Sequence, residues 1–528
     1  MPNQQNNSDT NAEFENDFQI TKTDYLSFRF CRKDLWLKKN RPDEFPQDKL
    51  SDFQLEIVKE GKEVDKESQN LFPEGIFVEG DQDVAVAETK YHFDSINKKK
   101  EAVLFQAAIK LNPYYIRTDI IKWNPKTSSW ELYEVKATTQ IKREKFNNHI
   151  YDLAFQYNVC KKTGLDIKKV GVIYLNRDYK KDGDINYNQL FKTTDVTDEV
   201  VEIAPEVSEQ MDLMINYLQG PEEEYCQCRY RTRSADNHCS TFSYSNPDIP
   251  NYAVHDVTRI SGKKLGLLVD DNILSIDDIP DDFKLSDNQV LQVQSAKQNK
   301  AIIDTEQIYD FLQDFQYPLY FLDYESYLPA VPWFDRYGPY QNIVFQYSLH
   351  ILEKEMPNDG DVEWLHNNLK HTEFLATKPN DPSFDITESL KKDIKEDGGT
   401  VIVWHKPFEM GRNKELAELN PAYSNYMHQI NDRIVDLKEI FSKGMYVDPK
   451  FKGSASIKKV LPVLAPELSY ENLPINNGAD ANKTWGKMIK GELSESEMKK
   501  VQHDLLVYCK QDTFAMVRIW QVLKNLFD

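Results

Sequence analysis

Hydrophobic residues recur along this chain with two different spacings, which predict where helices and strands form. Residues 114–139 contain two β-rich runs separated by the turn-forming sequence NPKTSS at 124–129, and this arrangement predicts a β-hairpin. Residues 149–164 have helical spacing and end at Gly164, a residue type that commonly terminates helices. The apolar run at 168–176 then predicts a buried strand. This β–β–α–β order indicates an α/β core.

A second region with the same mixture of spacings begins near residue 304. Apolar runs at 317–327, 342–352 and 400–405 predict three strands. Residues 501–526 keep a helical period throughout, which predicts one long amphipathic helix at the end of the chain. The fold class that we expect is therefore α/β, with two α/β domains in one chain.

Between and before these regions the pattern is weaker. Residues 24–39 carry apolar residues at helical spacing, whereas 220–251 are rich in Cys, Arg, Ser, Asn and Pro, so we expect irregular structure there. Short helical patterns broken at Pro280 indicate a small helical connector. We divide the chain into a disordered polar tail (1–17), a first domain (18–245), the connector (246–303) and a second domain (304–528).

Composition narrows the classes of protein to consider. Of 528 residues, 40% are hydrophobic and 12% aromatic, so the chain can build sizeable cores. No apolar run approaches the roughly 18 residues of a membrane helix, and the start MPNQQNNSDTNAEFENDF lacks the pattern of a secretory signal. We expect a cytoplasmic protein without a membrane partner. The net charge of −21 opposes general adhesion to nucleic acid, but it leaves room for a nuclease whose metal site lies in a local basic groove.

The first candidate site lies on the predicted hairpin. Asp119 is on its first strand, and Glu134 and Lys136, two residues apart on the second strand, face the same side. If the hairpin aligns them, the two carboxylates can bind Mg²⁺ and the lysine can polarise the attacking water. A solvated strand face with an ordinary Glu/Lys pair would give the same pattern.

This arrangement resembles the P-D-(D/E)-x-K nucleases of the RecB and CRISPR-associated type, which have a restriction-endonuclease-like fold. In that family a helix with a glutamine follows the E-x-K strand, and Gln156 in DLAFQYNV matches it. The resemblance also implies a further acid from a preceding element, for which Glu79 in EGIFVEGD is the candidate.

The cysteines extend the resemblance. RecB-like members with an iron–sulfur cluster have one cysteine upstream of the core and three after it, and this chain offers Cys31, Cys226, Cys228 and Cys239. The resemblance implies a [4Fe–4S] cluster that ties the ends of the domain together. The C-x-C-x₁₀-C spacing departs from the family, and His238 beside Cys239 leaves a Zn²⁺ site open, as do unliganded reduced thiols.

The second candidate site lies in the C-terminal region. Asp323 and Glu325 end an apolar strand on one face, HKPFE puts Glu409 at a strand-to-helix junction, and Tyr508 and Asp512 share a helix face at i, i+4. Clustered carboxylates repel one another without cations, which favours a metal site.

This order of motifs resembles the DEDD exonucleases of the DnaQ, RNase H-like class. The resemblance implies that Asp323, Glu325, Glu409 and Asp512 hold two Mg²⁺ or Mn²⁺ ions and that Tyr508 positions the attacking water. Glu409 stands where the family normally has aspartate. We interpret Asp436 in RIVDLKEIF as a supporting carboxylate rather than a ligand.

Two other segments are candidates for contact with nucleic acid. Lysines around the Gly-Ser turn of DPKFKGSASIKKVLP, at 450, 452, 458 and 459, are placed to hold backbone phosphates, or they form a solvated charged run. Trp333 and Phe334 are candidates for stacking on unpaired bases, although packing under a Pro-rich loop explains them equally well.

The whole order of motifs resembles bacterial proteins that fuse a RecB-like domain to an RNase H-like domain and have no assigned biological role. It implies a metal-dependent DNA nuclease with a DEDD 3′→5′ exonuclease site and a second RecB-like site, acting on DNA with a single-stranded end, in repair or defence. The alternatives are a nucleic-acid-binding scaffold with one or both sites inactive, or an exonuclease directed at RNA.

Overall fold

The computed structural model describes residues 18–45, 52–233, 237–357, 362–470 and 473–527. The protein is α/β, and two α/β units follow one another along the chain, as the sequence predicted. The polar tail that we assigned to residues 1–17 lies outside the described residues. No helix among the described residues is long and apolar enough to cross a membrane.

The first unit is built on a six-stranded sheet whose strands follow chain order. Pairing is antiparallel except for the parallel pairs β1–β2 and β4–β5. The strands are β1 (Ile76–Phe77), β2 (Ala102–Leu111), β3 (Tyr114–Asn124), β4 (Ser129–Lys136), β5 (Ile167–Leu175) and β6 (Phe191–Asp195). The predicted hairpin is confirmed as β3 and β4, with Asn124 paired to Ser129 across the turn.

Helices cover both faces of this sheet. The larger core lies between the sheet and the helices α5 and α7, whereas α3 packs against β4 on the other face. The helices are α1 (Lys22–Phe30), α2 (Arg32–Asn40), α3 (Asp52–Ser68), α4 (Gln82–Ser95), α5 (His149–Lys162), α6 (Tyr187–Leu190) and α7 (Thr197–Gln219).

The helical pattern at 24–39 folds as two helices rather than one. Cys31 has an extended backbone, with φ −153° and ψ 103°, and it separates α1 from α2. A capping box at Thr21 starts α1, and the break at Cys31 turns the chain so that α2 packs against α7. Helical spacing alone does not reveal such a break, because the extended residue is itself buried and apolar.

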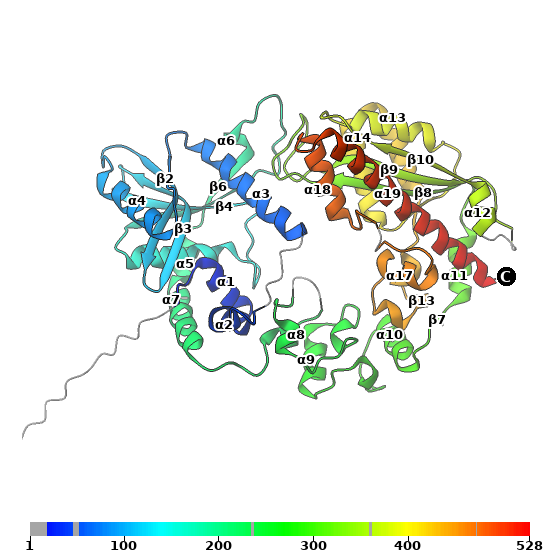
Figure 1. Cartoon of the computed structure of the whole chain (residues 1–528), viewed down its shortest axis with the longest axis horizontal. Coiled ribbons are helices and arrows are strands. Elements are labelled where there is room, and N and C mark those ends of the chain that lie inside the picture. Colours follow the sequence, from blue (N-terminus) through cyan, green and yellow to red (C-terminus); the bar gives the residue numbers. More distant parts are fainter. Residues whose placement is uncertain (1–17, 46–51, 234–236, 358–361, 471–472, 528) are drawn as a thin grey trace, which may run out of the picture.

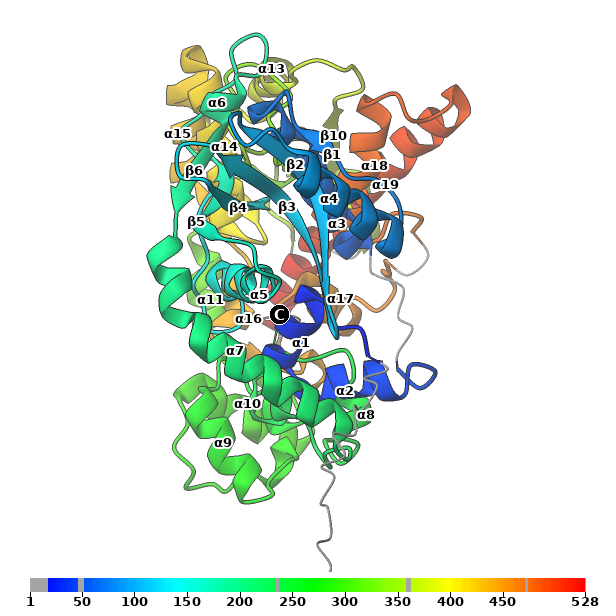
Figure 2. The ribbon, with the colours of Figure 1, turned by 90° about the vertical axis from the view of Figure 1, so that its left-hand side faces the viewer.

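The connector runs from the first unit to the second along the lower side of the molecule in Figure 1. It contains short 3₁₀ turns and two helices, α9 (Gly262–Asp270) and α10 (Asp287–Gln298), packed around a small core of their own, and the short helix α8 (Phe242–Ser245) precedes it. In the turned view α9 lies at the opposite end of the molecule from α13 (Figure 2). The helical connector expected from the sequence is therefore present.

The second unit has a five-stranded sheet in the order β10-β9-β8-β11-β12. Strands β8, β11 and β12 are parallel, and β9 is antiparallel to both of its neighbours. The strands are β8 (Leu319–Tyr327), β9 (Ile343–Leu352), β10 (Leu369–Leu375), β11 (Val401–Val403) and β12 (Ile434–Asp436), and a separate pair joins β7 (Ile302–Ile303) to β13 (Tyr446–Val447).

Helices also sandwich the second sheet. One core includes side chains of α17, α18 and the long α19, and the other includes side chains of α13, α14 and α15. The helices are α11 (Thr305–Gln313), α12 (Val362–Asn368), α13 (Ser383–Asp393), α14 (Lys406–Leu419), α15 (Ser424–Asp432), α16 (Glu439–Ser442), α17 (Ile457–Leu464), α18 (Gly478–Ile489) and α19 (Glu495–Lys524). The predicted closing helix is confirmed and begins earlier than expected, at a capping box on Ser494.

The two units touch directly as well as through the connector. Helices α3 and α18 are in contact, and the Tyr340 hydroxyl donates a 2.6 Å hydrogen bond to the carbonyl of Ala137, the residue after β4. Lys181 of the first unit forms a 2.7 Å ion pair with Asp335 of the second. The end of the E-x-K strand is thus held against the second unit.

Candidate metal centres

Three carboxylates converge in the second unit. Asp323 and Glu325 point to one side of β8 because alternate strand residues share a face, and Asp512 comes from α19. One oxygen from each lies within 4.8 Å of the other two. The sequence prediction that these acids come together is confirmed by this geometry.

Glu409 lies in the first turn of α14, immediately after β11, and is 3% exposed. One of its carboxylate oxygens, Oε2, is buried and has no hydrogen-bond partner. A buried oxygen of this kind is costly unless something compensates it. Burial, followed by the charges of Asp323 and Glu325, raises the pKa of Glu409. Glu409 is not one of the three acids whose oxygens converge within 4.8 Å.

The carboxylates of this centre repel one another, so a bound cation would stabilise their charged forms. Burial raises the pKa of Asp323 well above its ordinary value, with a further contribution from Asp512, and the pKa of Glu325 is raised in the same way. Among the cations near them, Lys458 lowers the pKa of Glu325 and Asp512, but it does so from an exposed position. Carboxylate oxygens are the preferred ligands of Mg²⁺, so the donor set fits divalent cations.

Two tyrosines approach the same carboxylate. The hydroxyl of Tyr470 donates a 2.7 Å hydrogen bond to Asp512 Oδ1, and Tyr508 also hydrogen-bonds Asp512. Burial raises the pKa of Asp512 to about 6, and the two hydroxyls limit that rise. Sequence reasoning missed Tyr470, because no spacing rule connects it to α19.

The residues beside this centre have structural roles. Asp436 accepts hydrogen bonds from the backbone N–H groups of Lys406 and Lys438, at 3.0 and 3.1 Å, so it supports the start of α14 as the sequence suggested. Cys509 is buried, with its sulfur 3.6 Å from Asp323 Oδ2.

The first unit brings its predicted residues together as well. Asp119 Oδ2 accepts a 2.8 Å hydrogen bond from the N–H of Val135, so the hairpin aligns it with the E-x-K strand. Glu134 is 2% exposed and lies 2.8 Å from the ammonium of Lys136. Gln156 donates to Glu134 Oε2 at 2.7 Å, which fixes the orientation of that carboxylate.

Two further charged residues enter this centre, and the sequence did not reveal them. Lys22, the first residue of α1, lies 2.5 Å from Glu134 Oε1, and Asp152 of α5 lies 2.5 Å from Lys136. Opposing effects act on the pKa of Glu134: burial, the largest influence, favours its neutral form, but the charges of Lys136 and Lys22 outweigh it and lower the pKa. Two ammonium groups therefore share two carboxylates at this point.

A bulge supplies the polar side chain next to Asp119. Gln106 is skipped in the pairing of β2 with β3 and has a left-handed φ of 55°. Its amide lies 3.1 Å from Asp65 of α3 and 3.5 Å from Asp119. Burial raises the pKa of Asp65 to about 6 and that of Asp119 to about 7.

The structure corrects the candidate acid of this centre. Glu79 lies in the loop before α4, where it is exposed and its backbone N–H donates to Glu88. The short strand β1 ends at Phe77, so Glu79 does not project from the sheet toward Asp119. The acid that reaches Asp119 from outside the sheet is Asp65, on a helix that we did not anticipate.

The four cysteines form a second compact group. Cys31, Cys226, Cys228 and Cys239 are all buried, and their sulfurs lie within 4.8 Å of one another. Four thiolates bound at about 2.3 Å to one tetrahedral ion would lie about 3.8 Å apart. The Cys226 and Cys239 sulfurs are 3.8 Å apart, which matches that edge.

Surrounding residues hold the cysteines in place. Asn246 donates a 3.2 Å hydrogen bond to the Cys226 sulfur, and Asp34 of α2 accepts from the backbone N–H of Thr241 at 3.0 Å. His238, the alternative zinc ligand, stacks on Phe242 and directs Nε2 to the carbonyl of Arg231 instead. The donor set is therefore four thiols, of which Cys31 comes from the junction of α1 and α2.

The two segments that the sequence suggested for contact with nucleic acid differ in their surroundings. Trp333 packs against Tyr327 and Trp485, so the packing explanation holds for it rather than an open stacking platform. Lys452 and Lys458 are hydrogen-bonded to Asn251 and to the carbonyl of Asn476. Lys450 and Lys459 are exposed.

The chain is similar to one domain family and to proteins whose names state no activity. The profile of a domain of unknown function (DUF2779) matches residues 320–456, a stretch that contains Asp323, Glu325 and Glu409 and ends before α19. The chain is 29% identical over 309 residues to an uncharacterized protein of Ureaplasma parvum (UU173), an alignment that covers 52% of this chain and 41% of the relative. It is 25% identical over 223 residues to an uncharacterized protein of Mycoplasma genitalium (MG366), covering 39% of this chain and 32% of the relative. The chain thus spans less than half the length of the curated relatives it matches.

Proposed function

We propose that this protein is a cytoplasmic, metal-dependent nuclease that hydrolyses DNA phosphodiester bonds, with a two-metal 3′→5′ exonuclease site in its second unit. One observation carries the proposal. Asp323, Glu325 and Asp512 converge within 4.8 Å, and the buried Glu409 Oε2 beside them lacks a partner. Four acids arranged in this way are suited to divalent cations, and two such ions are the usual means of displacing a phosphodiester oxygen.

Each residue of this centre has a defined part in that chemistry. Bound divalent cations would activate the attacking water and stabilise the leaving oxygen. Asp323, Glu325, Glu409 and Asp512 would hold the cations, and Tyr508 would orient the water from its place beside Asp512. The sheet order, with β9 antiparallel to its neighbours β10 and β8 in a mixed sheet, supports the likeness to RNase H-like exonucleases, although a fold alone does not fix an activity.

The first unit is proposed to hold the second nuclease site. Asp119 and Glu134 would bind the cation, Lys136 would polarise the water, and Gln156 would keep Glu134 oriented. Four carboxylates, Asp65, Asp119, Glu134 and Asp152, surround two ammonium groups, so two negative charges remain when all are ionised. One divalent cation would balance that difference.

We also propose a structural metal at the four cysteines. The 3.8 Å separation of Cys226 and Cys239 favours a single tetrahedral ion such as Zn²⁺, because in a [4Fe–4S] cluster each thiolate binds a different iron and the sulfurs lie further apart. Metal analysis of the purified chain distinguishes one zinc from four irons.

The test of the nuclease is direct. The full chain is incubated with Mg²⁺ or Mn²⁺ and end-labelled single- and double-stranded DNA and RNA, and the products are resolved by length. Wild type should shorten DNA from its 3′ end, and Asp323→Asn and Asp512→Asn should abolish this shortening. Asp504→Asn, on the same helix and paired with Lys500, is the matched control. Unchanged shortening in both site variants would overturn the assignment, and preference for RNA would change the substrate class.

A scaffold that binds nucleic acid without cleaving it is the second candidate. It is favoured in the first unit by Lys22 and Lys136, which both lie within 2.8 Å of Glu134. In that case the first unit binds DNA without cutting it, and no cleavage survives once Asp512 of the second unit is replaced.

A further inference from the structure

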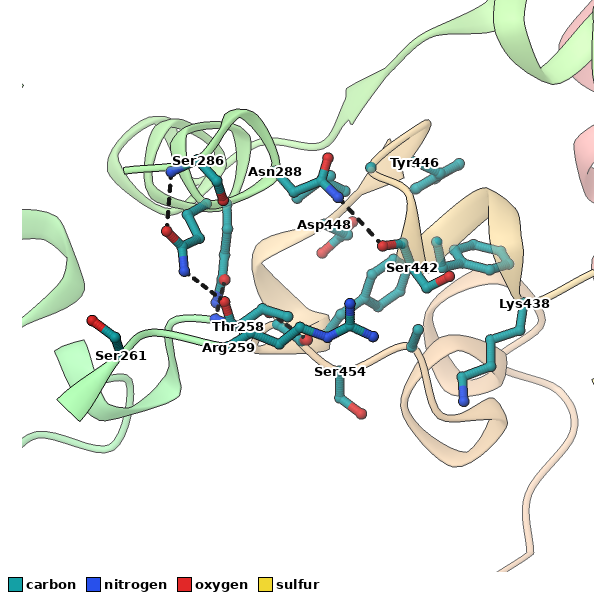
Figure 3. A pocket seen from close by; sticks show the side chains of 18 of the residues that line it. Thr258, Arg259, Ser261, Ser286, Asn288, Lys438, Ser442, Tyr446, Asp448 and Ser454 are labelled. Carbon is teal, nitrogen blue, oxygen red and sulfur yellow. Dashed lines mark hydrogen bonds between the residues drawn. The ribbon is translucent and has the colours of Figure 1, made fainter. Parts of the chain in front are cut away.

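A pocket of about 530 Å³ lies between the connector and the second unit (Figure 3). One wall carries Thr258, Arg259 and Asn288 of the connector, and the other carries Lys438 and Ser454 of the second unit. The carboxylate centre contributes no residue to it. A pocket of this volume has the size of a small-molecule or nucleotide site.

The walls of the pocket are joined by specific contacts. Thr258 Oγ1 donates a 2.7 Å hydrogen bond to the carbonyl of Gly453, and Gln292 accepts from the N–H of Thr258 at 2.9 Å. Gly453 has a φ of +74°, and a Cβ there would lie 2.5 Å from Gln292 Nε2. Only glycine allows this close approach, so the pocket is a preformed feature of the fold.

Positive charge gathers around the pocket in a chain whose net charge is −21. Arg259, Lys264 and Lys438 line it, and in the described part of the chain none of their side chains has an ion pair or hydrogen bond. The lining acid, Asp448, is engaged by the N–H of Lys450 at 2.8 Å. Lys438 also acts on the carboxylate of Asp436, whose pKa burial raises and this charge lowers. Three cations on the walls of one pocket, held by no ion pair or hydrogen bond among the described residues, favour an anionic ligand.

The pocket also has an aromatic side. Phe441, Tyr446 and Phe451 line it and pack on one another with ring centroids 5.8 to 5.9 Å apart. Tyr446 is half-buried and is therefore the ring best placed to meet a ligand. Aromatic faces beside cations are the pattern that binds bases and phosphates together.

A continuous segment leads from this pocket toward the carboxylate centre. Ser454 and Ala455 line the pocket, and Lys458, at the start of α17, lies near Glu325 and Asp512. Trp404 donates to the carbonyl of Ala455 at 3.1 Å and packs on Phe441.

We propose that this pocket binds a nucleoside phosphate unit, and that the unit belongs to the same single strand whose end lies at the carboxylates. The proposal rests on the proposed function for the identity of the strand. The Gly-Ser turn that the sequence marked for phosphates enters the pocket through Gly453 and Ser454, but the principal cations are Arg259 and Lys438, from opposite walls (Figure 3).

The test measures binding without hydrolysis. A fluorescent oligothymidylate is titrated with the full chain in EDTA, and Arg259→Ala/Lys438→Ala is compared with wild type. Affinity should fall about tenfold or more, since each cation contributes a charge-assisted contact. The slope of log affinity against log salt should fall by about 0.7 for each cation removed. Lys263→Ala/Lys443→Ala is the matched control, because both lysines neighbour pocket residues in sequence without lining the pocket.

Equal affinity and salt slope in the pocket variant and wild type would overturn the proposal. A nucleoside monophosphate can also be tested as a competitor of the oligothymidylate. If it displaces the oligothymidylate from wild type but does not bind the pocket variant, the ligand of the pocket is a free nucleotide rather than a unit of the strand. The two proposals fail by different results. If the proposed nuclease site is wrong, Asp512→Asn leaves DNA shortening unchanged, whereas the pocket variant still loses binding.

Discussion

The hydroxyl of Tyr470 donates a hydrogen bond of 2.7 Å to Asp512, the acid that α19 contributes to the carboxylate centre. Both side chains are at most 9% exposed, so the bond is shielded from water. It joins the segment before α18 to the last helix and orients one carboxylate oxygen toward the tyrosine. Tyr508 also hydrogen-bonds this carboxylate, which lies beside Asp323 and Glu325.

Tyr470→Phe should weaken cation binding at this centre. The hydrogen bond stabilises the charged form of Asp512, whose pKa burial raises to about 6, so its loss moves that pKa further up. We expect Mn²⁺ affinity to fall about tenfold, as measured by calorimetry in a chain that also carries Glu134→Gln. Tyr508→Phe should instead slow hydrolysis and largely retain affinity. Tyr309→Phe, an exposed tyrosine, is the control, and wild-type affinity in Tyr470→Phe would contradict the prediction.

Lys136→Met should remove the cleavage that remains after Asp512→Asn. Lys136 is the ammonium of the E-x-K strand and lies 2.8 Å from Glu134, so its removal takes away the group that polarises water but leaves both carboxylates. The measurement is residual hydrolysis of labelled DNA with Mn²⁺. Lys126→Met, at the exposed hairpin turn, should have no effect. Persistence of cleavage in Lys136→Met would place that activity elsewhere.

Replacing any one of the four clustered cysteines with serine should release the metal and destabilise the first unit. Cys31 joins α1 to α2, and Lys22 at the start of α1 reaches Glu134, so loosening α1 should also reduce cleavage by the first unit. Metal content and the first thermal transition are the readouts, and the second unit should keep its own transition. Cys160→Ala, within α5, should retain the metal. Four freely alkylated thiols in metal-free wild-type protein would end the hypothesis.

Acid should destabilise the second unit through the buried His350 and the half-buried His371 that packs on it. His350 hydrogen-bonds Thr513 at 2.8 Å, and burial lowers its pKa to about 2, while burial lowers that of His371 to about 4. Because the folded-state pKa lies below the ordinary 6.5, the neutral histidine is favoured by folding. The free energy of unfolding is therefore at its full value above pH 6.5 and decreases as the pH falls below 6.5. We expect a loss of about 1.4 kcal/mol per pH unit for His350, relative to His350→Gln, in denaturant unfolding. Parallel pH profiles for the two chains would refute this.

Local pattern was enough to predict most elements near the sites. The β3–β4 hairpin, α5, β5, β8, β9 and α19 follow from spacing and turn residues, because strands and helices with one buried face must repeat their apolar positions. The same spacing placed Asp323 beside Glu325 and Glu134 beside Lys136. Strand β10, which is only partly buried, escaped prediction because its apolar pattern is diluted.

Only the tertiary structure decided which distant residues complete each centre. Lys22, Asp65 and Gln106 reach the first centre through a helix start, a covering helix and a bulge, and Tyr470 reaches the second from a loop. These contacts depend on how elements far apart in sequence pack, and a bulge or an extended residue such as Cys31 leaves no periodic signal. The sequence alone determined the types of chemistry present, because acids, thiols and lysines can be read from it directly. Packing between elements determined which of these residues meet, and it left Glu79 outside the first centre.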